Sequence, residues 1–249
     1  MTSALFSPIQ LRKLALRKRV VISPMCQYTA TEGRANDWHM VQYGRFAVGC
    51  AGMVVFEATA ILPEGRITPG DLGLWEDGQI PGLAWITAFL RAQGAASCLQ
   101  LGHAGRKASS QRPWHGAGPL TAQDIAERDE APWPLVAPSA LAVDEGWPEP
   151  EAMTAPQIEA LVEAYSAAAR RALAAGFDAI ELHAAHGYLL HSFLSPLSNL
   201  REDSYGGSRE GRMRLPPRIA QTLRFVMSGG KDLWMARQRK RVLKANLLT

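Results

Sequence analysis

The chain has 249 residues, which is enough for one domain with a sizeable hydrophobic core. Hydrophobic residues make up 47% of it, as in ordinary globular proteins, and no apolar run approaches the roughly 18 residues of a membrane span. Residues 1–20 lack the apolar core of a signal peptide, so we expect a cytoplasmic protein with no membrane attachment.

The formal charge of +4 is concentrated at the carboxyl end. Residues 231–249 hold six basic side chains and one acidic one, which leaves 21 of the 27 basic and 22 of the 23 acidic residues for the rest. A basic tail can bind nucleic acid, but no aromatic residue is interleaved in the basic run 237–244, and the tail matches no known module. We therefore expect a solvated, mobile chain end and no nucleic-acid partner.

The cysteines are few and widely spaced. Cys26, Cys50 and Cys98 form no CxxC pair. This spacing argues against a disulfide framework and against a zinc cluster.

Hydrophobic periodicity predicts alternating strands and helices in the first half of the chain. The expected elements are a hairpin over 6–16, a strand over 20–23, a helix over 38–49, a strand over 53–58, a helix over 81–93 and a strand over 96–101. Gly94 ends the second helix. The hairpin is expected to cap one end of the fold.

The second half continues the alternation after a long interruption. Residues 107–156 are rich in proline and tryptophan and predict an excursion over the active face. A helix opens at Thr154–Pro156, continues to Ala175 and is closed by Gly176, and a strand follows over 179–183. The last helical segment covers 211–225, although Pro216 and Pro217 delay its start. Strands that alternate with helices indicate a parallel sheet.

The most specific motif follows that last strand. His183 and His186 stand three residues apart, and Tyr188 comes next. Imidazole and phenol donors at a strand end can polarise a carbonyl group and deliver a proton. The histidines could instead be structural, or metal ligands with His191, but no recognised metal pattern is present and we expect no metal.

The whole string from Asp178 to Arg212 resembles the signature of the old yellow enzyme family of FMN-dependent ene-reductases, and the chain fills every position of it. Residues 19–28, 55–60 and 98–107 resemble the first three barrel strands of the family's thermophilic-like branch, which carries a cysteine beside the flavin. The four blocks occur in family order, and the resemblance covers residues 1–225.

The resemblance implies a TIM (β/α)8 barrel, an FMN cofactor, and NADPH or NADH as reductant. It implies an oxidoreductase that reduces the C=C bond of a small α,β-unsaturated carbonyl compound, with His183 and His186 on the carbonyl oxygen, Tyr28 in the substrate pocket wall and Tyr188 as proton donor. It also implies the flavin contacts, which are Ser23, Pro24, Met25, Cys26, Ala58 and Gln100. A homo-oligomer is compatible with the sequence.

Two of these residues also have plainer interpretations. Cys26 could be only a small buried apolar side chain. Gln100 could be a surface amide, but on a buried strand it needs a hydrogen-bond partner, which the flavin edge would supply.

The chain departs from its family in one respect. A complete barrel needs eight strands, and only the first four or five fit here, with a hairpin before them and a long loop after the third. We expect residues 1–225 to be the amino-terminal portion of the barrel and 226–249 an atypical basic tail that reflects a truncation or a shifted reading frame. The family's FMN phosphate ligands lie in the missing portion, so the alternative is an inactive remnant that binds FMN poorly.

Overall fold

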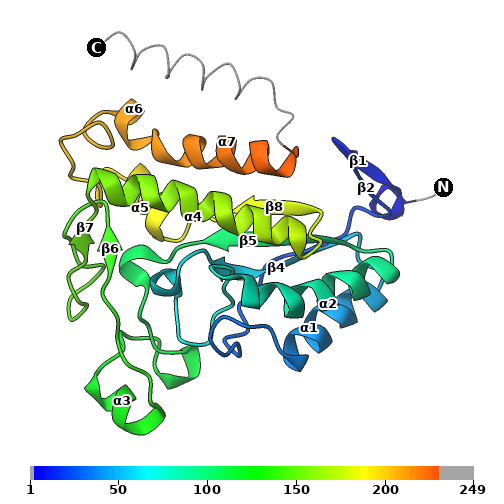
Figure 1. Ribbon diagram of the computed structural model, residues 1–249, viewed down its shortest axis with the longest axis horizontal. Helices are drawn as coiled ribbons and strands as arrows, with labels where there is room; N and C mark the ends of the chain where they lie inside the picture. The colour runs from blue at the N-terminus through cyan, green and yellow to red at the C-terminus, as the bar shows by residue number, and fades with distance from the viewer. Residues whose placement is uncertain (1–2, 230–249) are drawn as a thin grey trace.

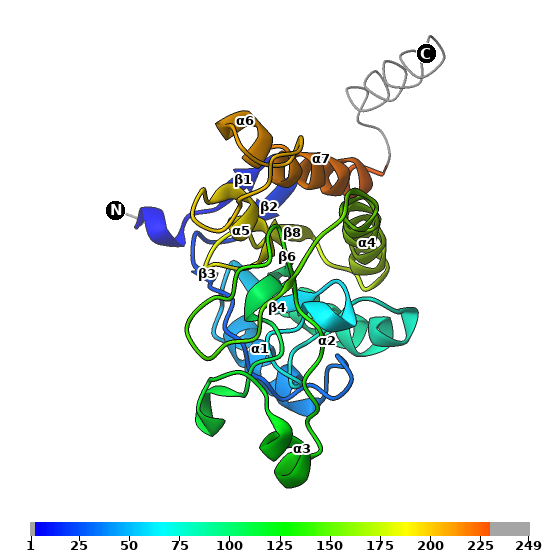
Figure 2. The ribbon, with the colours of Figure 1, turned by 90° about the vertical axis from the view of Figure 1, so that its left-hand side faces the viewer.

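The computed structural model describes residues 3–229, and its centre is a four-stranded parallel sheet. The strand order is β3 (Val21–Ile22), β4 (Met53–Ala60), β5 (Ala96–Gly102) and β8 (Ala179–Leu182). Figure 1 labels β4, β5 and β8, and Figure 2 labels β3. Each of these strands was predicted from its apolar run. The observed bounds differ from the predicted ones at the ends, where β4 continues to Ala60 and β3 is shorter than expected.

Four long helices connect and cover these strands. They are α1 (Asp37–Val48), α2 (Ile80–Ala92), α4 (Ala155–Ala174) and α7 (Leu215–Met227). Both views show α1 beside α2 and α4 beside α7 (Figures 1 and 2). The four long helices confirm the predicted ones. The prediction succeeded because the signals that begin and end a helix lie within a few residues of its ends. Thr154 and Gln157 form a capping box at the start of α4, and Gly176 continues the chain beyond α4 at a φ of +84°.

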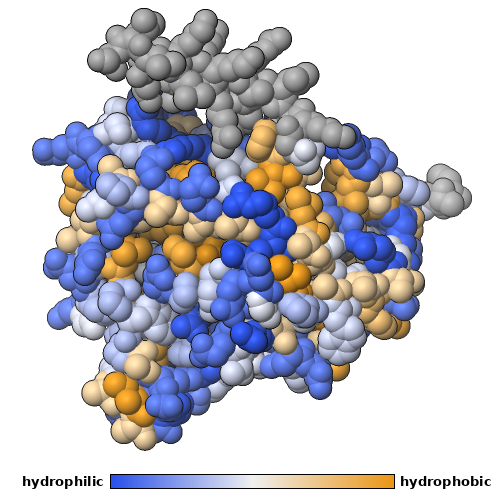
Figure 3. Space-filling model, viewed as in Figure 1, coloured by the Kyte–Doolittle hydropathy of each residue, from blue (hydrophilic) through white to orange (hydrophobic). Residues whose placement is uncertain are grey.

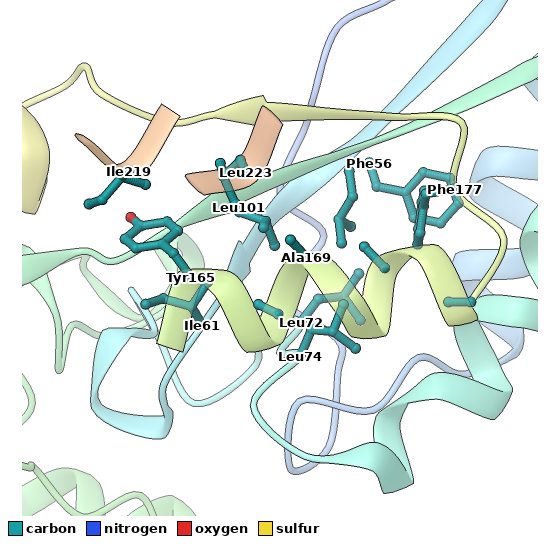
Figure 4. Close-up of a cluster of buried hydrophobic side chains, with 14 of the residues drawn as sticks. Phe56, Ile61, Leu72, Leu74, Leu101, Tyr165, Ala169, Phe177, Ile219 and Leu223 are labelled. Atoms are coloured by element: carbon teal, nitrogen blue, oxygen red, sulfur yellow. The ribbon is translucent and has the colours of Figure 1, made fainter. Parts of the chain in front are cut away.

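The hydrophobic core lies between the sheet and these helices. Phe56 of β4 stacks on Tyr43 of α1 at 3.9 Å between ring centroids and meets Phe177 edge-on at 4.8 Å. Tyr165 of α4 is fully buried, and Figure 4 shows it near Ile219 of α7. Truncation of a packed aromatic residue to alanine typically lowers the free energy of unfolding by about 3–5 kcal/mol. Because these rings pack between the sheet and the helices, they hold the strands and helices in their relative positions.

The amino-terminal hairpin forms as predicted. After a 3-10 turn η1 (Ala4–Phe6), strands β1 (Ile9–Leu11) and β2 (Leu14–Leu16) pair antiparallel. The hairpin tip, with Met53, Cys98 and Ala179 at the amino ends of their strands, borders a cavity of about 920 Å³. The hairpin therefore lies at the end of the sheet opposite to the strand carboxyl ends.

The long excursion contains structure that the sequence reasoning missed. It holds α3 (Ala122–Arg128), the paired strands β6 (Val136–Ala137) and β7 (Glu151–Ala152), and the 3-10 turn η5 (Pro113–His115). A further 3-10 turn, η4 (Gly105–Lys107), ends where the excursion begins. Thr121 caps α3 and Asp124 completes its capping box, so the signal was present in the sequence. Four further short elements were not predicted: η2 (Pro63–Gly65), η3 (Asp77–Gln79), α5 (Leu189–Leu194) and α6 (Arg209–Arg212).

The surface of the described part is mixed in character. Hydrophilic and hydrophobic side chains alternate over the face shown in Figure 3. None of the helices in residues 3–229 combines the length and the apolar character needed to cross a bilayer. Helix α7 continues past Phe225 to Met227. The expected mobility of the tail concerns residues 230–249, which lie outside the described residues.

Candidate active site

The carboxyl ends of the parallel strands bring the predicted site residues to one edge of the sheet. In the strand register, Gln100 of β5 lies beside Glu181 of β8, and Leu101 lies beside Leu182. His183 directly follows β8, and its backbone N–H donates to the carbonyl oxygen of Leu101 at 2.9 Å. Gln100 and His183 therefore lie at the same end of the sheet, where functional groups gather in parallel barrels.

The two histidines contact each other. His183 Nε2 lies 3.2 Å from His186 Nδ1, and the backbone N–H of Ala185 donates to His183 Nδ1 at 3.3 Å. Because Nδ1 of His183 accepts, its proton resides on Nε2 and is directed at His186. His186 then accepts through Nδ1 and carries its own proton on Nε2. Burial, and then the charge of His186, lower the pKa of His183, so this ring is neutral at pH 7.

Tyr188 completes the cluster. Its ring centroid lies 4.7 Å from that of His183 and 6.2 Å from that of His186. Burial raises the pKa of Tyr188 well above its usual value, and the charges of Cys26 and Asp71 raise it further. The phenol is therefore protonated over the whole physiological range. With Ala58, Asp71 and His183 it lines a cavity of about 10 Å³, roughly the volume that one water molecule needs.

Cys26 and Tyr28 lie on the segment that follows β3. Cys26 is partly exposed, and burial raises the pKa of its thiol to about 12, with Asp71 and Glu57 adding to the effect. Tyr28 has a φ of +56°, which is unusual for a large side chain. Ser23 and Met25 of the same segment are exposed, and Pro24 is half-buried.

A larger cavity of about 580 Å³ lies outside this cluster. Tyr28, His186 and Tyr188 line it together with residues of the long excursion, which include Lys107 and Trp147. Lys107 Nζ donates to the carbonyl oxygen of His186 at 2.8 Å and borders this cavity. The neighbouring Arg106 donates to the carbonyl oxygens of Leu141 and Ala142 in the excursion.

The amide of Gln100 has a partner within the protein. Its Nε2 donates to Glu181 Oε1 at 2.5 Å. Burial of Gln100 by itself therefore does not require a flavin contact, and the role of this residue stays a prediction.

Three residues of this region were missed by sequence reasoning. Asp71 is buried and lines the small cavity, where it accepts hydrogen bonds from the backbone N–H groups of Ile67 and Thr68. Burial raises the pKa of Asp71 to about 7. The other two are Glu57, a buried residue whose Oε2 accepts from the backbone N–H of Gln27, and Arg112, whose Nε donates to the carbonyl oxygen of Tyr28. Among these three residues, only Asp71 had a local signal in the sequence. Its spacing from Thr68 is typical of a turn that a side-chain hydrogen bond closes.

The third histidine considered as a metal ligand has another role. His191 Nδ1 accepts from the backbone N–H of Gly187 at 2.7 Å. Within residues 3–229, no group of three histidine, cysteine or acidic side chains is arranged to hold a metal ion.

Comparison with known proteins places the chain among flavin-dependent oxidoreductases. The sequence profile of the NADH:flavin oxidoreductase / NADH oxidase family matches residues 4–229. An NADH:flavin oxidoreductase of Gibberella zeae is 47% identical over 226 residues, which are 90% of this chain and 54% of that protein. An NADPH dehydrogenase of Geobacillus thermodenitrificans is 42% identical over 231 residues, which are 92% of this chain and 62% of that protein.

Solved structures agree with this placement. Morphinone reductase superposes with a TM-score of 0.77 at 32% identity, over 90% of this chain and 59% of that one. An Old Yellow Enzyme from Pichia sp. AKU4542 superposes with a TM-score of 0.74 at 31% identity, over 88% of this chain and 56% of that one. The four-stranded sheet and its helices are thus part of a TIM barrel of the old yellow enzyme kind.

The expected fold and family are therefore confirmed. The chain spans 54% and 62% of the length of the two curated relatives described above. FMN and NADPH or NADH, the cofactors that the sequence implies, are those of this group of proteins. The chain belongs to the NADH:flavin oxidoreductase / NADH oxidase family.

Proposed function

We propose that this chain carries the substrate half of an FMN-dependent ene-reductase site, which reduces the activated C=C bond of small α,β-unsaturated carbonyl compounds with NADPH or NADH. The observation that carries the proposal is the cluster of His183, His186 and Tyr188 at the carboxyl end of the sheet. The rings of these three hydrogen-bond donors contact one another, with centroids 5.0 Å apart for the two histidines and 4.7 Å apart for His183 and Tyr188. A cytoplasmic location and any homo-oligomer belong to the same proposal.

The residues at the strand ends suit a flavin ring. Cys26, Ala58 and Gln100 come from three neighbouring strands or the segments just after them, and Gln100 offers an amide to a ring edge of alternating N–H and C=O groups. Ser23, Pro24 and Met25 would supply backbone contacts along the same edge. FMN bound here would supply the hydride chemistry, while the protein orients and polarises the substrate.

The histidine pair would hold the carbonyl oxygen of the substrate. The hydrogen bonds of the pair leave His186 Nε2–H to face a ligand, and His183 Nε2–H would turn from His186 Nδ1 to the substrate oxygen when the substrate binds. Negative charge grows on this oxygen as the β carbon is reduced, so fixed donors stabilise the transition state more than the ground state. Lys107 would hold the loop carrying His186 in place through its bond to the His186 carbonyl oxygen.

Tyr188 would protonate the α carbon. Its raised pKa keeps the proton on the phenol until the substrate becomes strongly basic. The cavity of about 580 Å³ beside Tyr28, His186 and Tyr188 offers space for a small cyclic substrate.

The limited coverage of the relatives supports a second candidate function. In the family, the FMN phosphate is held by the carboxyl-terminal part of the barrel, and this chain spans only 54% and 62% of the two curated relatives. The same site would then bind FMN far more weakly than complete relatives do, and the chain alone would be slow or inactive.

Flavin titration separates the two candidates. Quenching of FMN fluorescence measures affinity, and NADPH oxidation with 2-cyclohexen-1-one measures turnover. Tight binding with turnover that is lost in Tyr188→Phe supports the complete enzyme site. Weak binding, with wild type and Tyr188→Phe equally inactive, supports the second candidate.

A further inference from the structure

Trp147 of the long excursion borders the larger cavity of the candidate site, although no step of the proposed reaction uses it. The same cavity, of about 580 Å³, is bordered by Tyr28, His186 and Tyr188. None of the predicted flavin contacts borders it. The cavity therefore belongs to the substrate side of the proposed site, and Trp147 forms part of its wall.

The loop that carries Trp147, residues 138–150, is held at both of its ends. Strands β6 and β7 pair in parallel on either side of it. Arg201 Nη1 donates to the carbonyl oxygen of Pro138 at 2.9 Å, where the loop begins, and to that of Met153 at 2.5 Å, just after β7. One guanidinium nitrogen and one pair of strands thus fix where the loop leaves and rejoins the rest of the protein.

A tight turn within this loop carries the indole ring. The backbone N–H of Trp147 donates to the carbonyl oxygen of Asp144 at 3.2 Å, and Gly146 between them has a φ of +79°. Glycine adopts this φ at the third position of a turn without strain. Asp144 Oδ1 also accepts from the backbone N–H of Glu145 at 2.8 Å. These two hydrogen bonds fix the backbone from which the indole ring projects.

The indole ring makes no hydrogen bond and no ring stack with the described residues. Trp38 and Trp133 both donate their Nε1–H groups to protein oxygens at 3.0 Å. Within residues 3–229, Trp147 Nε1 donates to no protein group, and its ring stacks on no other aromatic ring. Because this ring is half-buried and borders the cavity, it is available to stack on a ligand.

The cavity lining suits a ligand with a polar group and a planar apolar body. Lys107, His186 and Tyr188 supply the donors, whereas Ile67 and Trp147 are among the apolar residues that border the same space. Pockets of about 300–1,000 Å³ bury drug-sized ligands, so a cavity of about 580 Å³ has room for a ring beyond the enone itself.

The turn also restricts the charge of such a ring. Asp144 borders the cavity together with Trp147, so a carboxylate on the ligand would lie near an acidic side chain. Tryptophan offers a large and rigid contact surface, and stacked aromatic rings add affinity beyond the area that they bury. An uncharged aryl group is therefore the substituent that this wall fits.

We propose that Trp147 is a specificity-determining residue, and that the site takes enones bearing an uncharged aryl group, which stacks on the Trp147 indole while His183 and His186 hold the carbonyl oxygen. The inference rests on the proposed function, because it names the substrate class of the same site. It adds a residue that the reaction itself does not need.

Calorimetric titration with a matched pair of enones tests this role. 4-Phenyl-3-buten-2-one carries the aryl group, and 3-penten-2-one has a methyl group in its place. FMN is present at saturation, and NADPH is left out so that neither ligand is reduced. We expect Trp147→Ala to raise the Kd of the phenyl compound about tenfold, which corresponds to about 1.4 kcal/mol, and that of the methyl compound less than about twofold.

Two further variants serve as controls. Trp147→Phe keeps an aromatic ring on the same turn, so it should keep most of the preference for the phenyl compound. Trp85→Ala removes a tryptophan of α2 that is 53% exposed and does not border the cavity, so both Kd values should stay as in the wild type.

Three results overturn the inference. A preference for the phenyl compound that persists in Trp147→Ala shows that another wall holds the aryl group. An equal loss of affinity for both enones shows a general disturbance of the pocket. An equal loss of affinity for NADP⁺ assigns Trp147 to the nicotinamide cofactor instead.

Failure of the proposed function has a different signature. In each of the three cases above, the proposed function still stands if His183→Ala weakens the binding of both enones. If neither enone binds to the wild type, or if His183→Ala changes neither Kd, the proposed function fails and the inference fails with it.

Discussion

Arg112 joins the long excursion to the wall of the candidate pocket, because its Nε donates to the carbonyl oxygen of Tyr28 at 3.0 Å. The Nη1 of Arg112 forms an ion pair with Glu130, and both side chains are largely buried. The Tyr28 ring meets Trp114 of the excursion edge-on at 6.1 Å between centroids. The excursion is therefore part of the pocket and sets the position of Tyr28.

Arg112→Gln should loosen this connection. The substitution leaves Glu130 without its main partner in a buried setting, which typically costs about 2–4 kcal/mol. We expect the excursion to become sensitive to limited proteolysis and the Trp114 environment to change in fluorescence. Arg106→Gln is the matched control, since Arg106 donates to the carbonyl oxygens of Leu141 and Ala142 and not to that of Tyr28. Equal sensitivity in the two variants would argue against a special role for Arg112.

His183→Ala should weaken the binding of phenolic inhibitors and enones to the FMN-loaded protein. Loss of a hydrogen bond to a partly charged oxygen is worth about 1.5–3 kcal/mol, so the Kd should rise by roughly 10- to 150-fold. Titration with para-hydroxybenzaldehyde, followed by its absorbance change, gives the Kd. His115→Ala is the control, because His115 lies on η5 and borders neither of the two cavities at the site. An unchanged Kd in His183→Ala would contradict the assignment.

Tyr188→Phe should slow enone reduction without slowing flavin reduction. A positioned general acid contributes about 10²- to 10⁴-fold, and phenylalanine keeps the shape but carries no proton. Reduction of ferricyanide requires no protonated carbon and should continue at the wild-type rate. Because the pKa of Tyr188 is raised by burial, then by Cys26 and Asp71, wild-type turnover should show no loss from this group as the pH rises to 10. Equal slowing with both acceptors would point to a structural role.

His103 should make stability depend on pH. Burial lowers its pKa from about 6.5 to about 4, so between these values the unfolded chain binds a proton that the folded chain does not. Stability from this residue is complete above pH 6.5 and falls as the pH drops to 4, by about 3 kcal/mol at most. Asp71, whose pKa is raised to about 7 by burial, acts with the opposite sign, since the folded chain takes up its proton first as the pH falls.

These opposing effects make a difference measurement necessary. His103→Asn keeps an acceptor for the backbone N–H of Gly105, which donates to His103 Nδ1 at 3.0 Å, but has no titrating ring. In urea unfolding at pH 7 and pH 5, the stability of the wild type relative to His103→Asn should decrease as the pH falls. A difference that is constant between the two pH values would show that His103 titrates normally.

Local signals predicted most of the regular structure. The capping residues of α4 and the apolar stripes of the long helices act over a few residues, and strands β4 and β5 are continuous apolar runs because helices cover the sheet. The short helices α3 and α6 lack such stripes because each buries a single residue, Asp124 and Gly211, whereas α5 buries four of its six residues but is too short to show a helical period. For this reason the sequence predicted no helices or strands within the long excursion.

The sequence alone determined the family, the parallel barrel arrangement and the cluster of His183, His186 and Tyr188, because these three residues lie within one short loop after a strand. Only the tertiary structure decided what surrounds them. Glu57 and Arg112 form hydrogen bonds with backbone groups that are distant in the sequence. The hydrogen bonds of Asp71 are local, but its place at the small cavity and its burial exist only after the sheet has formed. Burial and long-range contacts set the protonation states of a site, and neither is encoded by local spacing.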